Sequence, residues 1–278
     1  MNRLARLPVL SALTLSLLIP MTGCRPLEAR DQLNKGVRAY KNQKFEDAIN
    51  HFQQAVNLDP SLPMARLYLA TAYAQQVVPG ADTPDNLKNA QMAIAGFQEV
   101  LAKEPKDLSS LKGIAVMYYN TNQYDKAKEW HKKVLEVDPK DAEAAYSIGQ
   151  IDWAQANRNA VSDLKAAGMQ DTSDGNPKAP KAVCQKITQD NSGLIAEGLQ
   201  YLDQSIQIRP NYDDAMAYIN LMYRRKADLE CGNDAARKAD LAQADDWRER
   251  AMGTRKTNEE KKNQGGGGIV MDADGNTK

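Results

Sequence analysis

Apolar and small residues recur at helical spacing through most of the chain, in pairs of stretches joined by short polar turns. The clearest pair lies in residues 108–141. Ile114, Ala115 and Tyr118 share one face of its first stretch, and the corresponding positions of the second are Tyr124, Ala127, His131 and Val134. Steps of three, four and seven residues place side chains on one side of an α-helix. The pattern therefore predicts two amphipathic helices that pack together as a hairpin.

The predicted hairpins repeat along the chain. Each second helix is followed by a charged residue and a proline, which has no N–H to continue a helix. These pairs are Asp59-Pro60, Glu104-Pro105, Asp138-Pro139 and Arg209-Pro210. The prolines are 45, 34 and 71 residues apart, which fits a 34-residue period with 11 extra residues in one unit and 37 in another. The expected units are 29–62, 63–107, 108–141, 142–212 and 213–256.

The extra residues are expected at the turns inside the second and fourth units, because the flanking residues match the two helices of each hairpin. The first insertion covers about residues 78–86 and the second about 158–192, with a loop signal at 171–177 and a short helix expected near 180–188. A decayed additional repeat is the alternative interpretation of the second insertion. Residues 257–278 are mostly polar and include four consecutive glycines, so we expect a disordered tail there.

The period and the small and aromatic seam positions resemble those of the tetratricopeptide repeat, a helix–turn–helix unit. The resemblance implies an all-α fold, a right-handed solenoid of about five helix hairpins with insertions in repeats two and four. In such a solenoid each repeat contacts only its neighbours, and together the repeats bury a continuous core.

The resemblance also implies that the first helices line a concave groove that binds partner segments. The residues expected there are Tyr40, Lys112, Tyr119, Tyr146, Gln150, Trp153 and Arg224. Aromatic rings beside two cations suit an extended peptide or helix with apolar side chains and an acidic group. The alternative is that these residues pack between neighbouring first helices, which we expect for Leu33, Val37 and Val116.

One binding mode of this family is not expected here. Chaperone-binding relatives hold a C-terminal carboxylate with a clamp of Lys, Asn and Arg side chains. The matching positions in this chain are Leu33, Val37, Tyr68, Ser109 and Gly113. None of these side chains carries the positive charge that a carboxylate needs.

The N-terminal pattern is typical of an export signal. Arg3 and Arg6 precede the apolar run 7–19, which is too short to cross a bilayer. Met21-Thr22-Gly23-Cys24 follows and resembles the lipobox of bacterial lipoproteins, although Met21 stands where Leu is usual. The resemblance implies that residues 1–23 are removed, that Cys24 is lipidated, and that residues 24–28 form a short tether.

The expected location is therefore the cell envelope, with the protein facing the periplasm and anchored in the outer membrane. Arg25 rather than Asp at the position after the cysteine favours the outer membrane. An ordinary signal peptide with a chance cysteine is the alternative.

Two further cysteines, Cys184 and Cys231, would share this oxidising compartment. Within the implied solenoid, the turns inside repeats four and five project from the same edge, so we expect a disulfide between the two. The alternative is two unrelated buried thiols.

Composition and motifs argue against several other functions. The chain has 36 basic and 36 acidic residues, so no net charge draws it to nucleic acid. Its two histidines, His51 and His131, lie on predicted second helices and have no partners in the sequence that indicate catalysis. Residues 272–276 begin like a calcium loop but lack the glycine that must follow. No cofactor, metal or small-molecule substrate is expected.

The sequence thus predicts a non-catalytic scaffold that binds envelope proteins or peptides. A dedicated assembly factor for an outer-membrane barrel, a secretin or a pilus complex is the narrower alternative. An envelope enzyme is the alternative from another class, but no catalytic motif supports it.

Overall fold

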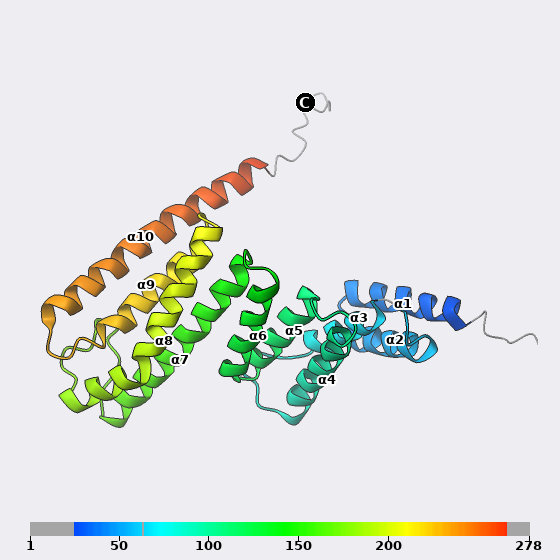
Figure 1. Ribbon diagram of the computed structural model, residues 1–278, viewed down its shortest axis with the longest axis horizontal. Helices are drawn as coiled ribbons and strands as arrows, with labels where there is room; N and C mark the ends of the chain where they lie inside the picture. The colour runs from blue at the N-terminus through cyan, green and yellow to red at the C-terminus, as the bar shows by residue number, and fades with distance from the viewer. Residues whose placement is uncertain (1–24, 63, 266–278) are drawn as a thin grey trace, which may run out of the picture. The chain divides into compact units, whose positions relative to one another are not determined.

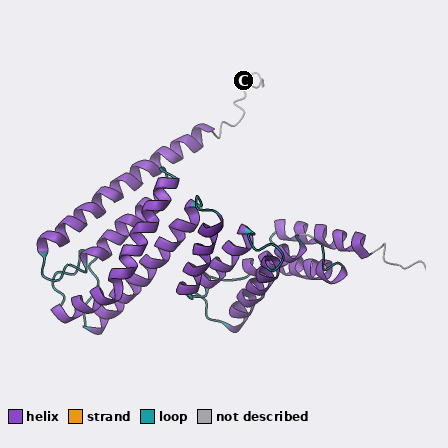
Figure 2. Cartoon of the chain, viewed as in Figure 1, coloured by secondary structure: helices purple, strands orange, loops and turns teal. Residues whose placement is uncertain are grey.

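A computed structural model describes residues 25–62 and 64–265 of the chain (Figure 1). The described residues form ten α-helices joined by loops, without strands among them, which confirms the all-α prediction (Figure 2). The chain divides into two compact units, residues 1–65 and 66–278, and each is described here by itself.

The first unit is a single helical hairpin. Helices α1 (Arg25–Lys41) and α2 (Phe45–Leu58) pack through small residues, including the fully buried Ala48 and Ala55. Gly36 is required at the closest approach, because a Cβ atom there would lie 2.5 Å from the Phe52 ring. The short turn between the helices matches the first predicted repeat.

The second unit begins with two hairpins of ordinary length. They consist of α3 (Ala65–Gln75), α4 (Pro84–Leu101), α5 (Leu108–Asn120) and α6 (Tyr124–Val137). Their core contains Ala70, Phe97 and Ile114. Asp107 and Asp141, 34 residues apart, each accept a hydrogen bond from a backbone N–H in the first turn of the following helix. These N-caps fix where the first helices of repeats three and four begin.

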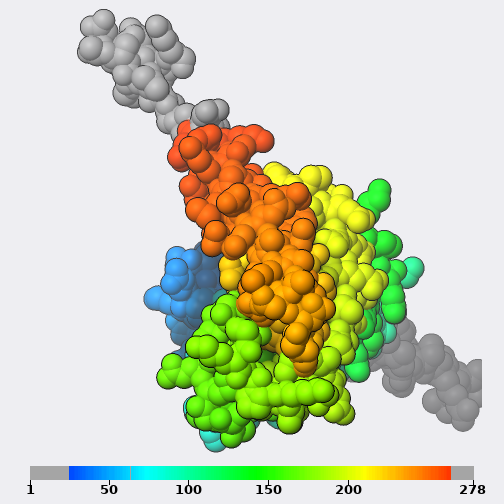
Figure 3. All heavy atoms as spheres, turned by 90° about the vertical axis from the view of Figure 1, so that its left-hand side faces the viewer, coloured from blue at the N-terminus to red at the C-terminus, as the bar shows by residue number. Residues whose placement is uncertain are grey.

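The remaining four helices are mostly longer. They are α7 (Ala142–Ala166), α8 (Lys181–Ile208), α9 (Asp213–Ala227) and α10 (Asp234–Gly265). Their shared core includes Ile195, Leu202, Ile219 and Met222. Helix α10 packs along α9 as an outer layer, visible in orange across the yellow residues in Figure 3.

The two predicted insertions have different outcomes. Residues 76–83 connect α3 to α4, close to the expected position of the first insertion. The loop signal at 171–177 lies in the loop 167–180, and the helix expected near 180–188 is the start of α8, but residues 158–166 continue α7 rather than forming part of a turn. No separate hairpin forms there, so the decayed-repeat alternative is also wrong.

This lengthened hairpin has a small core of its own. Leu164 and Ile187 are buried against each other, and Asn191 donates a hydrogen bond to the Ala156 carbonyl at 2.9 Å. The extra residues of α7 therefore add helical packing that the sequence pattern did not predict.

Two boundaries also need correction. Residues 25–28 belong to α1 rather than to a tether, and residues 257–265 continue α10 rather than starting a disordered tail. The expected signal peptide, Cys24 and residues 266–278 lie outside the described residues. Among the helices that are described, none combines the length and apolar character needed to cross a bilayer.

Candidate functional site

Four aromatic rings gather where α7 meets α9. Tyr146 lies with its ring centroid 5.0 Å from Tyr212 and 5.5 Å from Tyr218, and Trp153 lies 5.4 Å from Tyr218. The rings meet edge-on or tilted, which is the favoured geometry of aromatic pairs. We call Tyr146, Trp153, Tyr212 and Tyr218 the aromatic cluster. All four are half-buried, so each retains surface that a ligand can cover.

Polar groups fix the orientation of the cluster. Gln150 donates a hydrogen bond from Nε2 to the Tyr218 hydroxyl at 3.0 Å. Burial raises the pKa of Tyr146, and the neighbouring Tyr218 raises it further. The phenol therefore stays neutral and keeps its O–H as a hydrogen-bond donor.

Helix α5 extends this surface into the neighbouring repeat. Lys112, Val116 and Tyr119 share one face of the helix, with Tyr119 tilted against Tyr124 at 5.7 Å. Burial raises the pKa of Tyr119, and Tyr218 also contributes. Val116 is 43% exposed, so the expectation that it packs against another helix was wrong. An exposed valine beside half-buried aromatics makes this face suited to an apolar ligand.

Lys112 already has partners within the protein. Its Nζ lies 2.5 Å from Asp141 Oδ2 and 3.7 Å from Glu143 Oε2. The ammonium group thus links α5 to the start of α7, and its charge is largely balanced before any ligand arrives.

Arg224 lies elsewhere than expected. Its guanidinium donates to Asp245 of α10 at 2.9 Å and to the Ser173 carbonyl at 3.4 Å. The arginine therefore ties α9 to α10 and to the α7–α8 loop, and it is not part of the aromatic cluster. Tyr40 belongs to the first unit, where it packs against Phe45 at 5.4 Å.

Tyr212 and Tyr218 are the members of the cluster that the sequence did not predict. The residue expected in the groove from this helix was Arg224 rather than either tyrosine. The sequence signal that could have indicated them is a pair of tyrosines, six residues apart, at the start of a predicted first helix.

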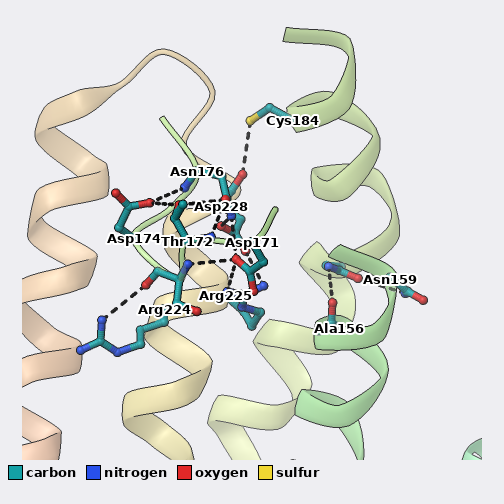
Figure 4. A network of polar contacts seen from close by, with 12 residues as sticks. Ala156, Asn159, Asp171, Thr172, Asp174, Asn176, Cys184, Arg224, Arg225 and Asp228 are labelled. Atoms are coloured by element: carbon teal, nitrogen blue, oxygen red, sulfur yellow. Dashed lines mark hydrogen bonds and ion pairs between the residues drawn. The ribbon is translucent and has the colours of Figure 1, made fainter. Parts of the chain in front are cut away.

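The predicted disulfide between Cys184 and Cys231 is present, with the two Cα atoms 5.7 Å apart. It joins the start of α8 to the loop between α9 and α10. A buried polar network next to it holds the α7–α8 loop against the end of α9 (Figure 4).

Arg225 is the centre of this network. Its guanidinium is 2% exposed and lies 3.0 Å from Asp171 and 3.2 Å from Asp228. Asn176 donates to both carboxylates, at 3.0 Å to Asp171 and 2.8 Å to Asp228. Burial raises the pKa of Asp228 to about 6, although Arg225 opposes that rise.

A second charged network joins α6, α7 and α8. Lys128 lies 2.6 Å from the fully buried Asp152 and 2.9 Å from Glu197, and Lys132 lies 2.7 Å from Glu197. Burial raises the pKa of Asp152 to about 7. The group links three helices and stands apart from the aromatic cluster.

The histidines occupy structural positions. Burial lowers the pKa of His131 to about 4, so its imidazole is neutral at pH 7. His51 Nδ1 lies 2.7 Å from Gln32 Oε1 on the neighbouring helix of the first hairpin. Within the described part of the chain, no three His, Cys, Asp or Glu side chains are grouped so that they could hold a metal.

Comparison with known proteins agrees with the repeat period. Residues 36–77 match a family model described as TPR repeat, and residues 87–151 match one described as tetratricopeptide repeat. Hsp70-Hsp90 organizing protein 2 of Arabidopsis thaliana is 29% identical over 51% of this chain and 24% of its own length. The mitochondrial import receptor subunit TOM70 of Rattus norvegicus is 26% identical over 45% of this chain and 21% of its own length. The chain thus spans about a quarter or less of the length of these curated relatives.

Solved structures share the fold. MamA from Desulfovibrio magneticus RS-1 superposes with a TM-score of 0.54 at 15% identity, covering 83% of this chain and 96% of that one. A MamA double mutant gives a TM-score of 0.56 at 15% identity, with coverages of 84% and 97%. Because these identities are low, the likeness extends to the arrangement of helices alone. The helical hairpins, their 34-residue period and the matches to two repeat families show that residues 36–77 and 87–151 are tetratricopeptide repeats.

Proposed function

We propose that the chain is a non-catalytic scaffold that binds a segment of a partner protein on the face formed by α5, α7 and α9. The observation that carries the proposal is the half-buried aromatic cluster continued by the exposed Val116. Rigid aromatic side chains supply large contact areas at low entropic cost, and they dominate the energetics of protein interfaces.

The chemistry of this face favours an apolar segment. The phenols and the Trp153 indole offer N–H and O–H donors, while Lys112 is already paired with acidic residues of this chain. The carboxylate clamp of chaperone-binding relatives has no counterpart at Leu33, Val37 or Gly113. Affinity would therefore come from burial of aliphatic side chains rather than from capture of a terminal carboxylate.

The curated relatives support binding to proteins as the general role. Their names describe an organizing protein for two chaperones and a receptor subunit for protein import. Both roles require recognition of other polypeptides, and neither name describes a catalyst. This supports a role in protein binding for the present chain.

We also propose that the scaffold is anchored in the bacterial envelope by a lipid on Cys24 and faces the periplasm. The sequence 21–24 supports this, and two or more acyl chains hold a protein stably on a membrane. Because α1 begins at Arg25, the first hairpin would start directly at the lipid. Cys24→Ala should then leave the protein in the soluble fraction of lysed cells, whereas recovery in the membrane fraction would contradict the anchor.

Site-specific photocrosslinking tests the binding face. A photoreactive residue in place of Val116 should crosslink a partner polypeptide in intact cells. Val161 of α7 is 40% exposed and provides the matched control position. Equal crosslinking from both positions, or none from position 116, would contradict the proposed face.

The identity of the crosslinked protein separates two versions of this function. One stoichiometric partner from an outer-membrane barrel, a secretin or a pilus complex would indicate a dedicated assembly factor. Several unrelated partners would indicate a general adaptor.

A further inference from the structure

We propose that residues 269–272 of this same chain, Ile-Val-Met-Asp, bind the aromatic cluster and occupy the proposed binding face until a partner displaces them. The proposal rests on the proposed function, because it names a regulator of that same face. It is carried by where α10 ends, by the sequence that follows, and by the charge at the edge of the cluster.

Helix α10 brings the end of the described chain to the start of α9. Asn258 donates to the Asn211 carbonyl and to Asp213 Oδ1, both at 3.0 Å. Arg255 pairs with Asp213 at 2.7 Å. Tyr212 stands between these two contact points in the sequence, and its ring packs at a tilt against Tyr146 in the cluster. Residues 255–258 of α10 therefore lie beside one edge of the cluster.

The distances permit the contact. Seven residues separate Asn258 from Gly265 at the end of α10, which is about 10 Å of helix. From Gly265 to Met271 an extended chain reaches about 20 Å. Gly265 to Gly268 are four consecutive glycines, which allow the chain to reverse direction. Met271 can therefore return to Tyr212 with several ångströms to spare.

The tail sequence fits an aromatic surface. After Gly253 the chain is polar, apart from Ala273 and the aliphatic run Ile269, Val270 and Met271. Burial of three adjacent aliphatic side chains against an apolar surface within reach is favourable. Methionine also makes favourable contacts with aromatic rings through its sulfur.

Charge at the edge of the cluster complements the tail. Asp272 and Asp274 follow the aliphatic run. The Arg209 guanidinium lies 4.4 Å from the centre of the Tyr212 ring, is 44% exposed, and has Glu143 at 3.7 Å as its acidic neighbour. An aspartate that follows the aliphatic run can pair with this arginine while Ile269 to Met271 cover the rings.

The test uses the full chain with p-benzoylphenylalanine in place of Met271. Irradiation of the purified protein should join position 271 to residues 141–158 or 210–224, which contain the four rings. Mixing isotopically light and heavy chains distinguishes contact within one molecule from contact between two. Crosslinks within one chain support the proposal, whereas crosslinks between copies, or to helices outside the cluster, overturn it.

Two charge reversals sharpen the result. Arg209→Glu should lower the crosslinking yield within the chain about fivefold, the equivalent of one exposed ion pair. Arg248→Glu on α10, at a similarly exposed position, should leave the yield unchanged. Equal yields from both variants would show that Arg209 does not hold the tail, and would overturn that part of the proposal.

The two proposals fail separately. If position 271 does not reach the cluster while position 116 still crosslinks a partner protein, the self-binding tail is wrong and the binding face stands. If position 116 captures no partner, the proposed function is wrong, whatever the tail does.

Discussion

Arg224 and Arg225 are neighbours on α9 with very different surroundings. Arg224 pairs with Asp245, whose side chain is 53% exposed, so water screens much of that interaction. Arg225 is buried between Asp171 and Asp228, and its removal would leave both carboxylates without a cation. Two adjacent positions on one helix thus hold a surface ion pair and the centre of a buried ionic network.

We predict that Arg225→Ala lowers the free energy of unfolding by about 3–5 kcal/mol, because breaking a buried ion pair leaves an uncompensated charge. The matched variant Arg224→Ala should cost about 1 kcal/mol or less. Urea denaturation followed by circular dichroism measures both. Similar losses for the two variants would contradict the network.

Asp152 predicts a dependence of stability on pH. Its pKa is raised to about 7 by burial, so the folded protein holds a proton that the unfolded chain has already released. The contribution of Asp152 to the free energy of unfolding therefore falls as pH rises from about 4 to about 7. Lys128 offsets part of the cost of the ionised form, at 2.6 Å from the carboxylate.

We predict that Asp152→Asn gains stability relative to the parent chain as pH rises from about 4.5 to 7.5, by up to about 3 kcal/mol. Denaturation curves at the two pH values measure the difference. Asp246→Asn, at an exposed position on α10, should show no such trend. A parallel pH dependence for parent and Asp152→Asn would mean that Asp152 is ionised throughout this range.

At the scale of elements, the lengthened hairpin of α7 and α8 is the feature that repeat periodicity missed. Its extra turns carry Asn157, Arg158 and Asn159, which resemble a polar loop in sequence. They are helical because Ala156, Ala160 and Leu164 keep a narrow apolar stripe that packs on α8. A stripe of small residues indicates a buried helix face only weakly when the helix that packs against it is unknown.

The disulfide and the Arg225 network act on the same part of this hairpin. Cys184 lies in the first turn of α8, and the bond closes a loop of 47 residues through α9. Its cystine is expected to stabilise the protein mainly by restricting the unfolded chain.

We predict that replacing Cys184 and Cys231 together by Ser lowers the free energy of unfolding by up to about 4 kcal/mol, the chain-entropy value for a loop of this length. A thiol reductant should have the same effect on the parent chain and none on the double variant. If the parent does not respond to reductant under unfolding conditions, the two cysteines are not paired in the protein.

At the scale of the whole molecule, the repeat architecture was predictable because it follows from a period. Prolines after second helices, and small residues such as Ala115 and Ala127 at the seams, identify hairpins wherever they recur. The disulfide followed from the same architecture. The lengths of the individual helices were less predictable, because extra helical turns do not change the proline that follows the second helix of a hairpin.

The candidate site was predictable only in part. Tyr146, Gln150, Trp153 and Tyr119 lie on the expected first helices, since their spacing in the sequence defines the helix face. Tyr212 and Tyr218 were missed because the orientation of α9 depends on how α8 and α10 pack against it. Side-chain partners such as Asp245 for Arg224 come from helices distant in sequence, so no local pattern reveals them.

The central claim is that the face of α5, α7 and α9 binds a protein segment. Val116→Asp tests it most directly, because Val116 is exposed on this face and its replacement removes little core packing. Affinity for the crosslinked partner segment should be measured by calorimetry alongside the melting temperature, with Val161→Asp as control. We predict that Val116→Asp weakens binding at least tenfold, whereas Val161→Asp binds like the parent and both variants melt within a few degrees of it. Unchanged binding by Val116→Asp, or equal weakening by the two variants, would contradict it.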